Sequence, residues 1–136
     1  MRTNQIQQVL KPLRQSSSQV FLGQGLYTLG LLGWILEQTG QADIAVTTFS
    51  TSDAFLSGVI NLRKRGLINH STLVADIKAS SKTLKLKRLM TEAFDDVRLT
   101  LNHSKIMLVS NAEWLVSVIH RRIRRMVIEQ NAPSSL

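Results

Sequence analysis

The chain has 136 residues and no cysteine, and its 17 lysines and arginines against nine aspartates and glutamates give a formal charge of +8. This length matches one ordinary domain with its own core, and the lack of cysteine excludes a disulfide framework or a thiolate metal site and suits a reducing cytoplasm. The three histidines are widely spaced, so we expect no metal and no cofactor. The positive charge favours a polyanionic partner such as DNA or RNA.

The first 20 residues predict a polar leader, because glutamine, serine and basic side chains alternate with only a thin apolar pattern. They should form a short amphipathic helix followed by a linker. Residues 24–38 predict a largely buried helix, with Gly40 at its C-cap. The apolar stretch at 21–36 contains several glycines and is shorter than the roughly 20 residues of a membrane-spanning helix, so we expect no integral membrane association.

Two pairs of a strand followed by a helix come next. Residues 42–49 are β-branched and of strand length, and the following segment predicts a helix capped by Ser50 or Ser52 and ending at Gly66. Residues 67–79 repeat the strand pattern, and residues 80–94 predict an amphipathic helix. We expect this helix to place Leu84, Leu86, Leu89, Met90 and Phe94 inward and Lys82, Lys85, Lys87 and Arg88 outward.

After Asp95 and Asp96, which we interpret as a helix-to-strand turn, three short strands are predicted: VRLTL, KIMLV and EWLVSVI. The loop SNA is short enough to join the last two in a hairpin. Strand–helix pairs followed by a strand meander predict an α/β domain with a mixed β-sheet covered by helices. We expect the domain to span residues 21–119, and residues 120–136 to form a basic C-terminal segment and tail.

The stretch LNHSKIMLVS contains a histidine and a lysine two residues apart at the start of an apolar run. In an extended strand, His103 and Lys105 would project side by side. A neutral imidazole can attack phosphorus, and an adjacent ammonium group neutralises the phosphate oxygens. The alternative interpretation is a chance pair, because H-x-K is a short and common pattern.

Together with TTFSTSDAF upstream and EWLVSVI downstream, this pair resembles the half-site of the phospholipase D superfamily, in particular its phage and mobile-element members. The resemblance covers residues 44–119 and implies metal-independent hydrolysis of a phosphodiester through a phosphohistidine. It makes His103 the nucleophile and Lys105 the phosphate clamp. Because the chain has one H-x-K motif, a complete site implies a homodimer with two motifs facing each other.

The chain departs from this family at two places. Ser110 stands where the motif has aspartate, and HRRIRR (residues 120–125) replaces the serine and asparagine ligands of the relatives, which a local change of reading frame could explain. We therefore expect a phospholipase D-like half that is incomplete at its C-terminus. The resemblance matches Glu129 to the acid that accepts a hydrogen bond from the nucleophile.

Basic side chains supply the expected nucleic-acid contacts. Arginine can hold phosphate in a bidentate fork, whereas lysine acts as a point charge. The expected contacts are Arg121, Arg122, Arg124 and Arg125, with Lys82, Lys85, Lys87 and Arg88 as a second group. A solvated terminal helix or a nonspecific patch is the alternative interpretation of the arginine run.

Two functions remain open: a nuclease-like phosphodiesterase, and a catalytically inactive nucleic-acid-binding or regulatory module with the same fold. The intact H-x-K pair favours the first, and the missing serine and asparagine ligands favour the second. Of the other histidines, His70 is interpreted as a loop residue. The protonation of His120 should be disfavoured by the positive charges beside it. Trp34 and Trp114 are expected to be core or interface anchors.

Overall fold

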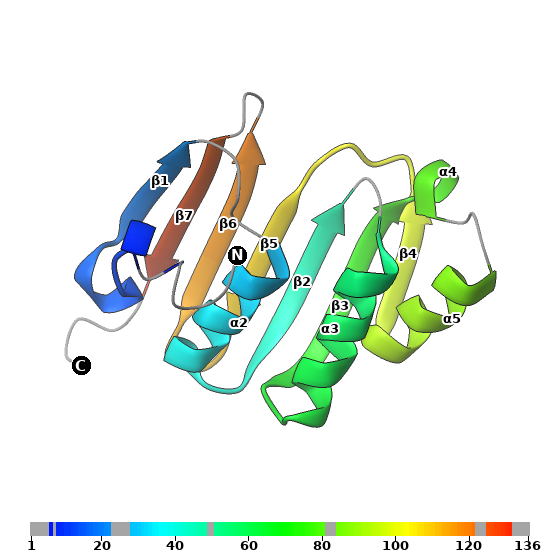
Figure 1. Ribbon diagram of the computed structural model, residues 1–136, viewed down its shortest axis with the longest axis horizontal. Helices are drawn as coiled ribbons and strands as arrows, with labels where there is room; N and C mark the ends of the chain where they lie inside the picture. The colour runs from blue at the N-terminus through cyan, green and yellow to red at the C-terminus, as the bar shows by residue number, and fades with distance from the viewer. Residues whose placement is uncertain are drawn as a thin grey trace.

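The computed structural model describes residues 6, 8–22, 28–48, 51–80, 84–121 and 125–131. Within them, seven strands form one mixed sheet in the order β1-β7-β6-β5-β2-β3-β4 (Figure 1). This confirms the predicted α/β fold class with a mixed sheet. The strands are β1 (Ser18–Leu22), β2 (Ala42–Thr48), β3 (Ile68–Asp76), β4 (Asp96–Thr100), β5 (Ile106–Ser110), β6 (Leu115–Arg121) and β7 (Arg125–Asn131).

The main helices lie on one face of this sheet. Figure 1 shows α2, α3 and α5 in front of the strands, and the described residues place no helix on the opposite face. That open face carries exposed apolar side chains, among them Val20, Leu108 and Leu115. The helical elements are η1 (Leu13–Gln15), α2 (Thr28–Thr39), α3 (Asp53–Lys64), α4 (Ile77–Ser80) and α5 (Leu84–Ala93).

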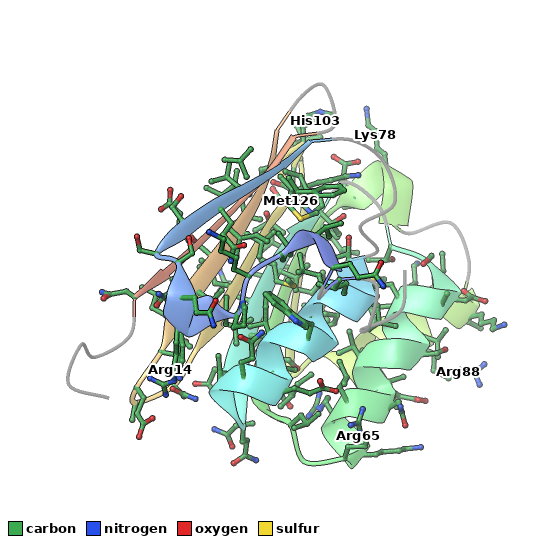
Figure 2. All side chains as sticks on the ribbon, turned by 60° about the vertical axis from the view of Figure 1, so that its left-hand side comes forward. Arg14, Arg65, Lys78, Arg88, His103 and Met126 are labelled. Atoms are coloured by element: carbon green, nitrogen blue, oxygen red, sulfur yellow. The ribbon has the colours of Figure 1, made fainter. Side chains whose placement is uncertain are left out.

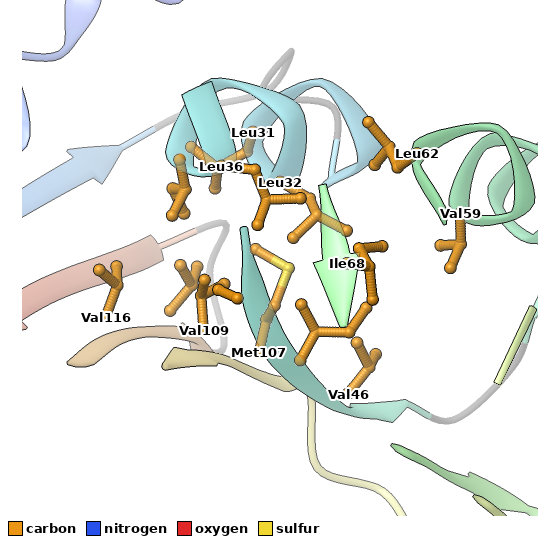
Figure 3. Packing of buried hydrophobic residues seen from close by; sticks show 14 of the residues in the cluster. Leu31, Leu32, Leu36, Val46, Val59, Leu62, Ile68, Met107, Val109 and Val116 are labelled. Atoms are coloured by element: carbon orange, nitrogen blue, oxygen red, sulfur yellow. The ribbon is translucent and has the colours of Figure 1, made fainter. Parts of the chain in front are cut away.

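The core fills the space between the helices and the covered face (Figure 3). Strand β2 alternates, so that Ile44 and Val46 point toward the helices, as the period of two in a strand requires. Helix α2 is buried along most of its surface, as predicted, and it ends at Gly40, where φ is +76°. In the described part of the chain, no helix is both long and apolar enough to cross a bilayer.

Helix α3 follows the predicted capping pattern. The hydroxyl of Ser52 accepts a hydrogen bond from the backbone N–H of Phe55 at 3.2 Å, which confirms Ser52 as the N-cap. Ser50 lies outside the described residues. A Cβ atom on Gly58 would overlap the side chain of Leu29, so glycine lets α3 approach α2 closely.

Helix α5 is amphipathic, but Leu84 is not inward. Leu86, Leu89, Met90 and Ala93 form an i, i+3, i+4, i+7 stripe, and this stripe is partly or fully buried. Leu84 is 75% exposed because it lies two residues before that stripe and so on the other side of the helix. Its predicted inward orientation is wrong.

The strand meander also differs from the prediction. Strand β4 pairs in parallel with β3 at the sheet edge, because α5 is a crossover that returns the chain to the same end of the sheet. Strand β5 then enters antiparallel to β2. The meander therefore consists of β5, β6 and β7, and VRLTL belongs to the parallel half of the sheet.

The sheet extends beyond the expected domain at both ends. Strand β1 begins at residue 18, within the expected leader of residues 1–20, and residues 125–131, expected in the basic C-terminal segment and tail, form β7 between β6 and β1. Within the run HRRIRR, His120 and Arg121 end β6 and Arg125 begins β7, so these described residues lie in strands and not in a tail. In β7, Met126 and Ile128 alternate with more exposed residues, which is a strand pattern hidden by the preceding arginines.

A polar network joins α3, β3 and β4 at the amino end of the parallel strands. Arg63 Nη2 lies 2.7 Å from Asp95 Oδ1, and the other Asp95 oxygen accepts a hydrogen bond from the backbone of Ser71 at 2.9 Å. His70 lies within β3 rather than in a loop, and its Nε2 lies 2.9 Å from Asp96 Oδ2. The two aspartates form the predicted turn, and their role in this network is structural.

Candidate functional site

The H-x-K segment lies at the edge of the sheet where the parallel strands β2, β3 and β4 end. Figure 2 shows His103 at this edge, near Lys78, which follows β3. Strand β5 begins there and β6 ends there, because both run antiparallel to their neighbours. Carboxyl ends of parallel strands are a common location for ligand sites in α/β sheets.

The histidine is presented by a loop and not by a strand. Residues 102–105 precede β5, which begins at Ile106, so the expectation that His103 and Lys105 lie in a strand is wrong. Asn102 organises this loop. Its Nδ2 donates to the carbonyl of Thr48 at 3.0 Å, and its Oδ1 accepts from Ser104 Oγ at 2.8 Å. The side chain of His103 is exposed.

A buried carboxylate accepts a hydrogen bond from the backbone of this loop. Asp76, the last residue of β3, is 2% exposed, and its Oδ1 accepts the backbone N–H of Asn102 at 3.1 Å. Its Oδ2 accepts the N–H of Lys78 at 3.1 Å. Asp76 was not predicted as a site residue. The signal that could have indicated this role is an acidic residue at the end of an apolar strand.

Lys105 lines a cavity of about 270 Å³ on the helix side of the sheet. Thr28 in α2 and Thr51 and Ser52, just before α3, form one wall, and His120 contributes from the end of β6. His103 is not among the residues that line it. The structure therefore places Lys105 and His120 in the lining of one cavity. His120 was not among the site residues predicted from the sequence.

His120 is half-buried in this cavity wall, and its backbone N–H donates to the carbonyl of Lys105 at 3.0 Å. Burial lowers the pKa of its imidazole, and the positive charge of Lys105 lowers it further. The predicted direction is confirmed. The largest cause is burial, and the charge of Lys105 is the second.

The sheet does not bring Glu129 near His103. Glu129 pairs with Ser117, which in turn pairs with Leu108, five residues beyond His103. At the rise of an extended strand this separation is about 15 Å along the sheet. Glu129 also faces the open side, because its neighbour Ile128 is buried under the helices.

The basic residues divide into two groups. The backbones of Arg121 and Arg125 pair with each other at the ends of β6 and β7, on the same sheet edge as Lys105. The second group lies on α5, where Lys85 forms an ion pair with Asp53 at 2.8 Å. Figure 2 shows Arg88, from this group, at the far end of the molecule from His103.

Several expected contacts lie outside the described residues, namely Lys82, Arg122 and Arg124. Lys87 lies on the exposed side of α5.

Across the described ranges, no three histidine, aspartate or glutamate side chains gather in a group that could hold a metal ion. Trp34 and Trp114 are both 3% exposed, and the guanidinium of Arg14 lies 4.8 Å from the centre of the Trp114 ring, so both tryptophans are core anchors.

Comparison with known proteins supports the fold. No protein-family model and no curated protein sequence matches the chain. Among solved structures, the chain is similar to polyphosphate kinase from Porphyromonas gingivalis, with a TM-score of 0.58 and 13% identity. The similarity covers 97% of this chain and 26% of the kinase, so the chain spans about a quarter of that protein. This likeness shows that the two proteins share an α/β fold over almost the whole of this chain.

Proposed function

We propose that this domain acts on the phosphodiester backbone of DNA or RNA, with His103 as nucleophile and Lys105 as phosphate clamp. One observation carries the proposal: the exposed His103, Lys105, the last residue of β6 (Arg121) and the first residue of β7 (Arg125) lie at the same edge of the sheet. A phosphate bound at Lys105 would therefore lie near the nucleophile, and the expected arginine contacts would add positive charge at this edge. Such a surface suits a polyanion better than a neutral ligand.

The resemblance to phospholipase D implies two chemical steps. In the first, His103 Nε2 bonds to phosphorus, the bond from phosphorus to the leaving oxygen breaks, and that oxygen takes a proton from a second histidine. In the second, a water oxygen bonds to phosphorus, the bond from phosphorus to His103 Nε2 breaks, and the proton of the water passes to the second histidine. The second His103 comes from another copy of the chain in a homodimer, and the cytoplasm is the proposed compartment.

The alternative is a nucleic-acid-binding or regulatory module without catalysis. The position of Glu129 favours it, because no carboxylate from the predicted position reaches His103. Under this alternative, the cationic edge would still bind phosphates through counterion release without reading sequence.

Cleavage of fluorescently labelled single- and double-stranded DNA and RNA in EDTA tests the first function. We expect turnover, and we expect His103→Ala to lower the rate by several orders of magnitude while the affinity changes only a few-fold, since the nucleophile itself is removed. His70→Ala is the matched control, because His70 lies near the start of β3, whereas the His103 loop lies where β3 ends. Undiminished cleavage by His103→Ala would overturn the assignment, as would a strictly monomeric chain in sedimentation at micromolar concentration.

Salt titration of binding tests the alternative. About four arginine–phosphate contacts give a slope of log affinity against log salt of about −3 to −4. Replacing Arg121, Arg122, Arg124 and Arg125 with alanine should remove most of that slope. The matched control replaces Lys85, Lys87 and Arg88 on α5. If the control variant loses the slope and the arginine variant keeps it, the binding surface lies on α5.

A further inference from the structure

We propose that the cavity beside Lys105 binds a terminal phosphate group of the substrate, with His120 and Thr51 as ligands in place of the missing serine and asparagine. This inference rests on the proposed function: it adds a subsite for the terminal phosphate of the same substrate, beside the phosphodiester that His103 attacks.

The cavity lies where several elements converge. Lys105 and Met107 are two residues apart, and Met107 faces the helices, so the lysine extends the covered face of β5 to the sheet edge. His120 lies on the neighbouring strand β6, joined to Lys105 through the backbone hydrogen bond at 3.0 Å. The cation just before β5 and the imidazole near the end of β6 thus line the same space.

The hydroxyl of Thr51 has no partner. Its Oγ1 is buried and, among the described residues, makes no hydrogen bond, whereas buried polar atoms nearly always have a partner. Thr51 lines the cavity just before α3, next to the cap residue Ser52. A phosphate oxygen in the cavity would accept a hydrogen bond from this hydroxyl, and the positive end of α3 would favour the anion.

The lining also limits what can enter. Phe55 and Ile106 make part of the wall apolar, so the ligand has an apolar or sugar portion beside its charged group. A volume of about 270 Å³ is at the small end of ligand pockets, and it suits one phosphate with an attached sugar better than a continuous strand. The ligand class is therefore a phosphate monoester, such as a mononucleotide or the phosphorylated end of a strand.

His120 has the chemistry that such a ligand requires. Burial, and then the positive charge of Lys105, lower the pKa of its imidazole, so the ring takes up a proton less readily than an exposed histidine does. Lys105 is the other titratable group among the described lining residues; α2 and α3 contribute Thr28, Thr51, Ser52 and Phe55. A bound phosphate would offset the charge of Lys105, so the pKa of His120 should rise when phosphate binds.

The test is a titration of the full chain with inorganic phosphate and with adenosine monophosphate, followed by NMR of the histidine rings and by calorimetry. In the wild-type protein we expect the His120 resonances to shift and its pKa to rise on binding, and this readout requires no variant. Lys105→Gln and His120→Phe should each weaken binding about tenfold or more, and Thr51→Val several-fold. His70→Gln and Thr39→Val, far from the cavity, should bind as the wild type does.

The outcomes separate this inference from the proposed function. Adenosine monophosphate binding that depends on His120 and Thr51, in a protein without cleavage activity, would support the phosphate site and contradict the enzyme. Cleavage that depends on His103 but is unchanged in His120→Phe and Thr51→Val would support the enzyme and overturn the phosphate site. Unperturbed His120 resonances at saturating phosphate would also overturn it.

Discussion

Asn102→Ala should destabilise the protein and loosen the loop that presents His103. The asparagine side chain takes part in three hydrogen bonds, at 3.0 Å to the carbonyl of Thr48, 3.2 Å to the carbonyl of Ser104 and 2.8 Å from the Ser104 hydroxyl. Each such bond contributes about 0.5–1.5 kcal/mol net. Because the loop is partly exposed and water replaces some of these bonds, we expect a loss of about 1–2 kcal/mol in the free energy of unfolding.

Urea denaturation of the variant measures this loss, and the nucleic-acid assays measure its effect on the site. The matched control is Asn111→Ala, because Asn111 also makes side-chain bonds, to the carbonyls of Thr39 and Gln41 and from the backbone of Glu113 and Trp114. Asn111 lies at the opposite end of the strands from His103. The Asn111→Ala protein should therefore be less stable than the wild type but should keep its binding and cleavage. Equal losses of activity in both variants, or an Asn102→Ala protein as stable as the wild type, would refute the reasoning.

Two further predictions concern stability. The pKa of Asp95 is lowered, chiefly by the hydrogen bond from the backbone of Ser71, so its stabilisation is complete above its unfolded value of 3.8 and is lost as the pH falls through the lower folded pKa. Urea denaturation between pH 7 and pH 3 should therefore show a smaller loss for Asp95→Asn than for the wild type, and parallel curves would contradict this. Gly66→Ala should cost about 1 kcal/mol, because its φ is +78°, whereas Gly33→Ala in α2, where an added Cβ meets nothing within 4 Å, should stabilise by up to about 1 kcal/mol. Thermal denaturation would show shifts of opposite sign, and shifts of the same sign would refute the assignment.

The sequence alone determined the elements whose signals are local. The β-branched run of β2, the Ser52 cap of α3 and the glycine after α2 depend on backbone preferences within a few residues, so their patterns are readable without the rest of the chain. The buried face of α5 was also predictable, except at its first residue, Leu84.

Tertiary structure decided the order of the strands. Whether VRLTL joins the parallel half or the meander depends on where α5 returns the chain, and a local pattern does not contain that information. The same holds for β7, whose partners β1 and β6 come from opposite ends of the sequence. The alternating apolar residues of β7 can be recognised as a strand only once its partners β1 and β6 are known.

The candidate site shows this division most clearly. The sequence marked His103 and Lys105, because a two-residue spacing is visible in a line of letters. Placing His120 beside Lys105 required β5 and β6 to pair, and placing Asp76 under the loop required β3 to end at the same edge. The pairing of distant strands decides which side chains are buried and which polar side chains share a cavity. A sequence match does not contain this information, so Glu129 was assigned a role beside His103 that its position in β7 does not allow.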